Sequence, residues 1–148
     1  MVEVSFYHLQ REPLDVALPK LLEKVYERSL KAVLIAGSGE RVDALNDRLW
    51  TYRKESFLPH GGPSDGNAAD QPVYLTTKEE NPNGATVLVM VDGVDPAFKG
   101  DFDRCLDMFD GNDEDAVAAA RERWKADKAA GHEVTYWQQG DRGWEKKA

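Results

Sequence analysis

The residues best suited to bind a ligand lie on one face of a predicted helix over residues 113–130. Five of them are spaced at i, i+4, i+7, i+8 and i+11, which places them along one side of a helix. They are Val117, Arg121, Trp124, Lys125 and Lys128. Arginine offers a planar pair of donors to a carboxylate, and lysine adds an adaptable point charge. We therefore expect this set, called here the basic–aromatic face, to suit a carboxylate beside a bulky apolar group.

The charge pattern of the same helix has a second explanation. Acidic residues occupy its first turn and basic residues its second half, as the helix macrodipole favours. Alanines on an offset face would let the helix pack closely on a sheet and leave Trp124 and the cations outward. These are Ala116, Ala119, Ala120 and Ala130. Spacing alone does not decide between a binding site and a solvated helix face.

Two acidic residues follow the most hydrophobic run of the chain, TVLVMV at 86–91. Asp92 and Asp95 would lie just beyond the carboxyl end of a strand, where open α/β sheets hold ligands and metal ions. The pair supports the hypothesis of a metal-dependent nucleotide-binding or nucleotide-hydrolysing enzyme. A solvated Asp-Gly turn is the simpler interpretation, because no third acid or histidine accompanies the pair at a recognisable metal-site spacing.

Other motifs for catalysis or nucleotide binding are incomplete. Gly37 and Gly39 follow a predicted strand, but Val42 replaces the third glycine of G-x-G-x-x-G, and no Walker-type phosphate loop occurs. The three histidines share no ligand spacing, and Cys105 lies in the pattern of a packed thiol. We therefore predict no catalytic residue, no metal site and no cofactor.

The composition of the 148-residue chain narrows the function further. Its net charge of −8 disfavours direct binding to nucleic acid, which depends on lysine and arginine neutralising phosphates. No apolar run reaches the roughly 18 residues of a membrane span, and the first residues alternate as in a strand rather than resembling an export signal. A single cysteine excludes an internal disulfide and suits a cytoplasmic protein.

Strands and helices alternate along the predicted chain. Strands are predicted at 2–9, 32–37, 73–77, 86–91 and 133–137, and helices at 12–32, 38–50, 96–109 and 113–130. The helix at 96–109 is based on the spacing of Phe98, Phe102, Leu106 and Phe109. The alternation predicts one α/β domain over 1–138, an open, mostly parallel sheet with helices on both faces and Rossmann-like topology. Residues 139–148 are predicted to form a charged, mobile tail.

Two longer segments resemble the chi subunit of bacterial DNA polymerase III holoenzyme. They are LNDRLWTYRKESFLPH at 45–60 and ARERWKADKAAG at 120–131, which carry the patterns W-x(5)-[ES]-F-[LV]-P-H and A-R-E-R-[YW]-K. The resemblance extends to VSFYHL at 4–9 and KAVLIA at 31–36 and so spans most of the chain, with a poor match over 77–112.

The resemblance implies a non-catalytic α/β subunit that links the clamp-loader assembly to single-stranded-DNA-binding protein (SSB). The family binds the acidic C-terminal tail of SSB, which ends in an aromatic residue with a free carboxylate, so DNA is reached only through SSB. By matching positions, Arg121 and Lys125 are the tail-binding cations, and Trp124 replaces a frequent tyrosine. Val117, Phe109 and Lys128 are added as neighbours by helical spacing alone.

The stretch RLWTYRKESFLPH at 48–60 supplies candidates for a second interface. In the family, the Phe of S-F-[LV]-P-H lies on the surface that meets the psi subunit, or a helicase that competes for it. That position corresponds to Phe57, with Leu58, Pro59 and Trp50 nearby. Core packing remains the alternative, above all for Trp50, which continues the apolar stripe of the preceding helix.

Overall fold

The computed structural model describes residues 2–51, 60–62, 68–140 and 143–147, with backbone only for 50–51. The strands are β1 (Glu3–Leu9), β2 (Ala32–Ile35), β3 (Val73–Thr76), β4 (Val87–Met90), β5 (Arg104–Asp110), β6 (Glu133–Gly140) and β7 (Gly143–Lys146). The helices are α1 (Leu14–Glu27), α2 (Gly39–Thr51) and α3 (Glu114–Ala129), with short 3-10 helices η1 (Ala68–Asp70) and η2 (Ala97–Asp101).

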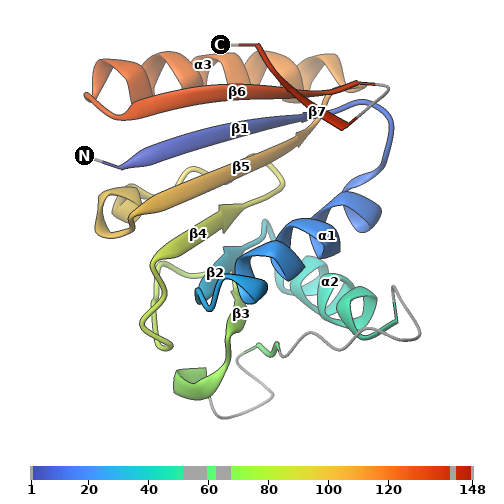
Figure 1. Cartoon of the computed structure of the whole chain (residues 1–148), viewed down its shortest axis with the longest axis vertical. Helices are drawn as coiled ribbons and strands as arrows, with labels where there is room; N and C mark the ends of the chain where they lie inside the picture. The colour runs from blue at the N-terminus through green and yellow to red at the C-terminus, as the bar shows by residue number, and fades with distance from the viewer. Residues whose placement is uncertain (1, 52–59, 63–67, 141–142, 148) are drawn as a thin grey trace.

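The strands form one seven-stranded sheet in the order β3-β2-β4-β5-β1-β6-β7. Neighbouring strands are parallel except for β6 and β7, which pair antiparallel as a hairpin. Helices α1 and α2 lie on one face and α3 on the other (Figure 1). The predicted α/β class with an open, mostly parallel sheet is confirmed.

Alternate residues of each strand enter two separate apolar layers. In β1, Phe6 lies on the α3 side and Tyr7 on the α1 side, and both are buried. The short inner strands β2 and β4 are buried on both faces, as their unbroken apolar runs predict.

Helix α1 contains a proline that a second helix accommodates. Pro19 has no N–H to donate to the carbonyl of Asp15, the usual i−4 acceptor. The Nε of Arg48 in α2 donates to that carbonyl instead, at 3.1 Å. The helix, which begins at Leu14, therefore continues through the proline, and the substitute hydrogen bond joins α1 to α2.

Helix α3 begins and ends where its sequence predicts. The carboxylate of Asp113 caps its N-terminus by accepting from the N–H groups of Asp115 and Ala116, at 3.0 and 3.4 Å. Beyond its C-terminus, Gly131 adopts a φ of +88°, a conformation that favours glycine.

Two predicted segments differ in the structure. The helix predicted at 96–109 is wrong: η2 ends at Asp101 and β5 follows. A short apolar run fits either period, and here Cys105 and Phe109 face α3 while Leu106 and Met108 face α1. In the segment predicted as a tail, 143–146 form β7, which pairs with β6, and Trp144 packs edge-on against Tyr7 at 5.0 Å between ring centroids.

Candidate functional site

Helix α3 lies on the sheet through a face that mixes small, apolar and charged residues. Ala120, Arg123 and Asp127 are buried beneath it. Val117 and Trp124 are half-buried and pack on the same apolar layer. Of the four alanines expected to face the sheet, only Ala120 is fully covered, and Ala119 and Ala130 are exposed. The helix is therefore rotated from the predicted orientation.

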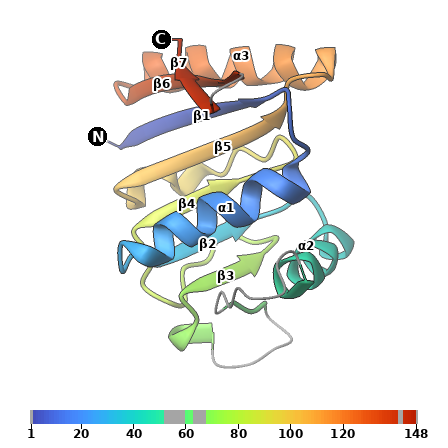
Figure 2. The same cartoon turned by 45° about the vertical axis from the view of Figure 1, so that its right-hand side comes forward.

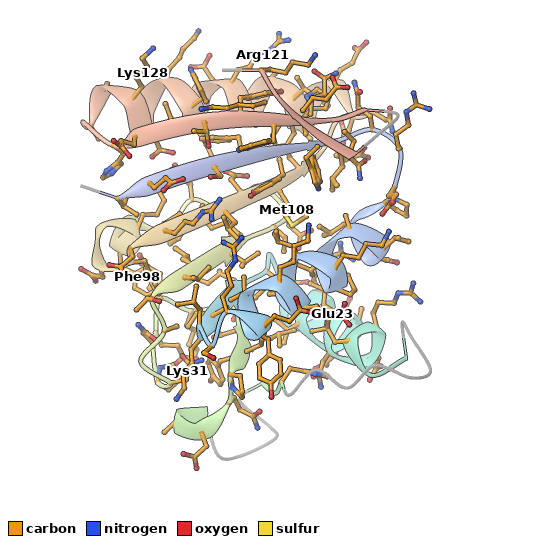
Figure 3. All side chains as sticks on the ribbon, in the orientation of Figure 1. Glu23, Lys31, Phe98, Met108, Arg121 and Lys128 are labelled. Carbon is orange, nitrogen blue, oxygen red and sulfur yellow. The ribbon has the colours of Figure 1, made fainter. Side chains whose placement is uncertain are left out.

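The cations of the basic–aromatic face do point outward. Arg121, Lys125 and Lys128 are all exposed, and Figure 3 shows Arg121 and Lys128 projecting from the outer side of α3. Lys125 contacts Glu122 at 3.6 Å, but both side chains are more than 70% exposed, so water weakens the pair. Arg121 has no ion-pair partner among the described residues and is available to an external carboxylate.

Trp124 does not stand outward between the cations, contrary to the expectation from spacing. Its ring is half-buried and meets Phe6 of β1 and Tyr136 of β6 edge-on, with centroids 5.7 and 5.9 Å apart. Seven residues after Val117, it lies on the side of the helix that approaches the sheet. It therefore anchors α3 and offers only part of its surface to a ligand.

A second aromatic group lies at the strand ends beside Arg121. Phe109 is buried in β5 and contacts His8 of β1 at 5.2 Å and Tyr136 at 6.0 Å between ring centroids. Nδ1 of His8 and the Tyr136 hydroxyl are 2.5 Å apart. Phe109 therefore belongs to the floor of this region, joined to Trp124 through Tyr136.

Sequence reasoning did not identify His8 or Tyr136 as part of this site. Both belong to strands predicted correctly, and period-two alternation places Tyr136 on the same side as Val134. The missing information was the adjacency of β1, β5 and β6, which only the sheet order provides.

Arg121 adds a positive potential to this aromatic group. Burial lowers the pKa of His8, and the nearby Arg121 guanidinium lowers it further, while Gly111 and Asp110 oppose the shift. Burial raises the pKa of the Tyr136 hydroxyl, and Arg121 opposes that rise. Both rings are therefore neutral near pH 7, and Arg121 is the charge that an anionic ligand would meet beside them.

Buried ion pairs join the sheet-facing side of α3 to β5 and to Lys99. Arg123 donates from Nε and Nη2 to the two carboxylate oxygens of Asp107 at 2.7 and 3.0 Å. Lys99 lies 2.6 Å from both Asp127 of α3 and Asp95. The hydrogen bonds and charges of both carboxylates raise the pKa of Lys99 against the lowering effect of its burial.

The two candidate metal-site carboxylates are used by the protein itself. Asp95 pairs with Lys99, and Asp92 accepts from the N–H of Gly37 at 3.1 Å and from Nε of Arg41 at 3.1 Å. Asp92 has a φ of +58°, as in a tight turn. Within the described ranges, no three metal-ligating side chains converge. The turn interpretation accounts for both residues.

Cys105 is a packed thiol, as predicted, although it lies in β5 rather than in a helix. Burial raises its pKa to about 12, so the reactive thiolate is scarce near pH 7.

None of the helices in the described part of the chain is long and apolar enough to cross a membrane.

The second predicted interface falls largely outside the structure. Phe57, Leu58 and Pro59 lie outside the described residues, and Trp50 is described by its backbone alone, in the last turn of α2. The apolar stripe of α2 that precedes Trp50 is buried, as predicted, and comprises Val42, Leu45 and Leu49.

Comparisons with known proteins agree with the resemblance of the motifs. A family model described as "DNA polymerase III chi subunit, HolC" matches residues 1–135. The probable DNA polymerase III subunit chi of Rickettsia prowazekii is 38% identical over 97 residues, which cover 66% of this chain and 59% of that protein. DNA polymerase III subunit chi of Pseudomonas aeruginosa is 28% identical over 137 residues, or 89% of this chain and 93% of that protein. The family is one of non-catalytic accessory subunits. Since the family model matches most of its length, the chain belongs to the DNA polymerase III chi subunit family.

Proposed function

We propose that this protein is an accessory subunit of the DNA polymerase III holoenzyme that binds the acidic C-terminal tail of SSB and links it to the clamp-loader assembly. One observation carries the proposal: Arg121 and Lys125 lie one turn apart on α3, both exposed, beside the half-buried ring of Trp124. DNA is then reached only through SSB, in the cytoplasm.

The chemistry of the tail suits this arrangement. The planar guanidinium of Arg121 can hold the terminal carboxylate by two parallel hydrogen bonds. The terminal aromatic ring can then lie on the partly covered surfaces of Val117, Trp124 and Tyr136, which pack on one apolar layer. Arg121 is close enough to Tyr136 to influence the pKa of its hydroxyl. Lys125 and Lys128 meet the acidic residues that precede the terminus.

We expect the SSB tail to bind weakly, because the α3 side chains that contact it are exposed to solvent. Few groups are desolvated, so each tail binds in the micromolar range, about −8 kcal/mol. Several tails on one SSB oligomer raise the effective affinity through local concentration. Added salt weakens binding, since the paired charges are solvent-exposed and within reach of screening ions.

We also propose a second interface for the partner that holds the protein in its assembly. The candidate residues are Phe57, Leu58, Pro59 and Trp50, and the partner is the psi subunit or a functional equivalent such as a helicase. The support for this interface is the S-F-L-P-H sequence alone. The proposal requires that a Phe57→Ala variant still binds the SSB tail but no longer binds the partner.

Fluorescence anisotropy with a labelled SSB-tail peptide tests the tail site. Arg121→Ala and Lys125→Ala should each weaken binding by about tenfold or more, by loss of a charge-assisted hydrogen bond. The control Lys31→Ala/Lys78→Ala removes two exposed cations elsewhere and should bind as the wild type does. Equal weakening in the control would mean a nonspecific charge effect, and no binding by the wild type would refute the function.

A further inference from the structure

In the described part of the chain, α1 and α2 leave β1, β6 and β7 largely uncovered on their face of the sheet. α3 covers β1, β5 and β6 on the opposite face, whereas α1 and α2 lie toward the β2, β3 and β4 half (Figures 1 and 2). Between α1 and the β6–β7 hairpin lies a groove of about 930 Å³. We call it the hairpin groove. It lies on the opposite face of the sheet from the basic–aromatic face.

Aromatic rings form one side of the hairpin groove. Trp144 of β7 stands edge-on to Tyr7, and Trp137 of β6 pairs with Tyr7 in the sheet register. Both tryptophans are only half-buried. Their residues follow position 135, where the family match ends. Trp137 and Trp144 therefore lie outside the part of the chain that matches the family model.

A hydrogen-bonded loop joins the two sides of the hairpin groove at one end. The side-chain oxygen of Gln139 accepts from the backbone N–H groups of Gln10, Arg11 and Glu12 at 3.0, 2.9 and 3.0 Å. Gln139 itself is 8% exposed, so these bonds are shielded from water. The hairpin and the start of α1 are thus joined, and the space between them is a feature of the fold.

The opposite side of the groove carries a row of cations. Lys20, Lys24 and Arg28 recur at every fourth residue and all line the groove. Lys20 is neutralised by Glu12 at 3.0 Å. Lys24 and Arg28 form no ion pair with any residue in the described ranges. Five cationic and three acidic side chains line the groove, in a chain whose net charge is −8.

The floor holds an arginine whose hydrogen bonding is incomplete. Nε of Arg104 is buried without a partner among the described residues, and the nearest carboxylate oxygen, on Glu3, is 3.9 Å away. Its Nη2 makes only long contacts, 3.5 Å to the Ser5 hydroxyl and 3.4 Å to the Tyr7 hydroxyl. A carboxylate that reached the exposed part of this guanidinium would strengthen its hydrogen bonding.

We propose that the hairpin groove binds an amphipathic α-helix of a protein partner, with its apolar face on Trp137 and Trp144 and a row of acidic residues against Lys24 and Arg28. A helix fits because parallel sheets are completed by helices on both faces. The four-residue spacing of Lys24 and Arg28 matches acidic residues at i and i+4 on a neighbouring helix. This site is independent of SSB-tail binding.

The test uses a designed helical peptide with leucines on one face and glutamates at every fourth position along its flank. A second peptide has lysines in place of the glutamates. Lys24→Glu/Arg28→Glu should weaken binding of the glutamate peptide by about tenfold or more, while Lys31→Glu/Lys78→Glu, with the same charge change, stays within about twofold. The lysine peptide should not bind the wild type.

A spectroscopic readout locates the bound peptide on the wild-type protein. The glutamate peptide should shift the indole N–H resonance of Trp144, assigned by its loss in Trp144→Phe, and leave that of Trp124 unchanged. Each of these results would overturn the proposal: no binding at about 1 mM peptide, equal binding of both peptides, a shift at Trp124 instead, or a dimer that Lys24→Glu/Arg28→Glu abolishes. Binding of a thymidine oligonucleotide that the same variant removes would assign the groove to nucleic acid and overturn it equally.

Discussion

Arg123 and Asp107 form a buried two-point ion pair that joins the middle of α3 to β5, with N–O distances of 2.7 and 3.0 Å. Arg123 stands between Arg121 and Lys125 in the sequence. At about 100° per residue, positions two before and two after it lie about 160° away from its own direction. An arginine held inward thus places both cations outward, so the ion pair positions the candidate site.

Removing one member of this pair should destabilise the protein strongly. Arg123→Met leaves Asp107 as an uncompensated buried charge, and we expect a loss of about 3–5 kcal/mol in the free energy of unfolding. Arg121→Met, at an exposed position two residues away, should change it by no more than about 0.5 kcal/mol. Urea denaturation of both variants measures the difference. A loss below about 1 kcal/mol for Arg123→Met would show that the pair is not required.

Trp124 should contribute more to stability than an exposed ligand contact would. Trp124→Ala removes the ring contacts with Phe6 and Tyr136 and should cost about 2–4 kcal/mol. Trp124→Tyr retains an aromatic ring and should cost less than about 1.5 kcal/mol. Thermal and urea unfolding compare the two. If Trp124→Ala were as stable as the wild type, the packing described for α3 would be incorrect.

Gly111 should tolerate no side chain. A Cβ there would overlap the His8 ring and lie 2.5 Å from the carbonyl oxygen of Leu9. Since both neighbours belong to the end of β1, Gly111→Ala should lower the free energy of unfolding by about 1–3 kcal/mol. Gly100→Ala is the matched control, because its added Cβ would meet no atom within 4 Å other than those of its chain neighbours and its own helix backbone. Similar losses in both variants would indicate a general glycine effect rather than a collision.

His8 should make the stability depend on pH. Its folded-state pKa lies below the ordinary value, chiefly because of burial. The unfolded state therefore binds more protons as the pH falls through about 6.5, and stability present above that pH is lost below it, by at most about 1.4 kcal/mol per pH unit. Urea midpoints between pH 8 and about pH 5 should fall more steeply for the wild type than for His8→Gln. Parallel curves would assign the pH dependence to other groups.

Much of the fold could be predicted from local patterns. The unbroken apolar runs of β2 and β4, the Asp113 cap and the glycine after α3 all specify their elements without knowledge of the rest of the chain. β5 could not be assigned in this way. Its apolar residues fit a helical period as well as a strand, and Asp107 within it is compatible with burial only because Arg123 lies opposite.

The exposed position of the candidate site's cations could be predicted from the sequence, but the residues that surround them could not. Helical spacing placed Arg121 and Lys125 on one exposed side. The inward position of Trp124 depends on how far α3 is rotated on the sheet, which its buried charges decide. His8 and Tyr136 join the site only because β1 lies between β5 and β6, a long-range arrangement that no local pattern encodes.

The most direct test of the central claim is calorimetric titration with intact SSB and with SSB that lacks its C-terminal tail. The wild type should bind intact SSB in a salt-sensitive manner and fail to bind the truncated protein. Arg121→Ala/Lys125→Ala should lose binding, and Lys31→Ala/Lys78→Ala should retain it. If truncated SSB bound as well as intact SSB, or if the Arg121 and Lys125 substitutions had no effect, α3 would not be the site of tail recognition.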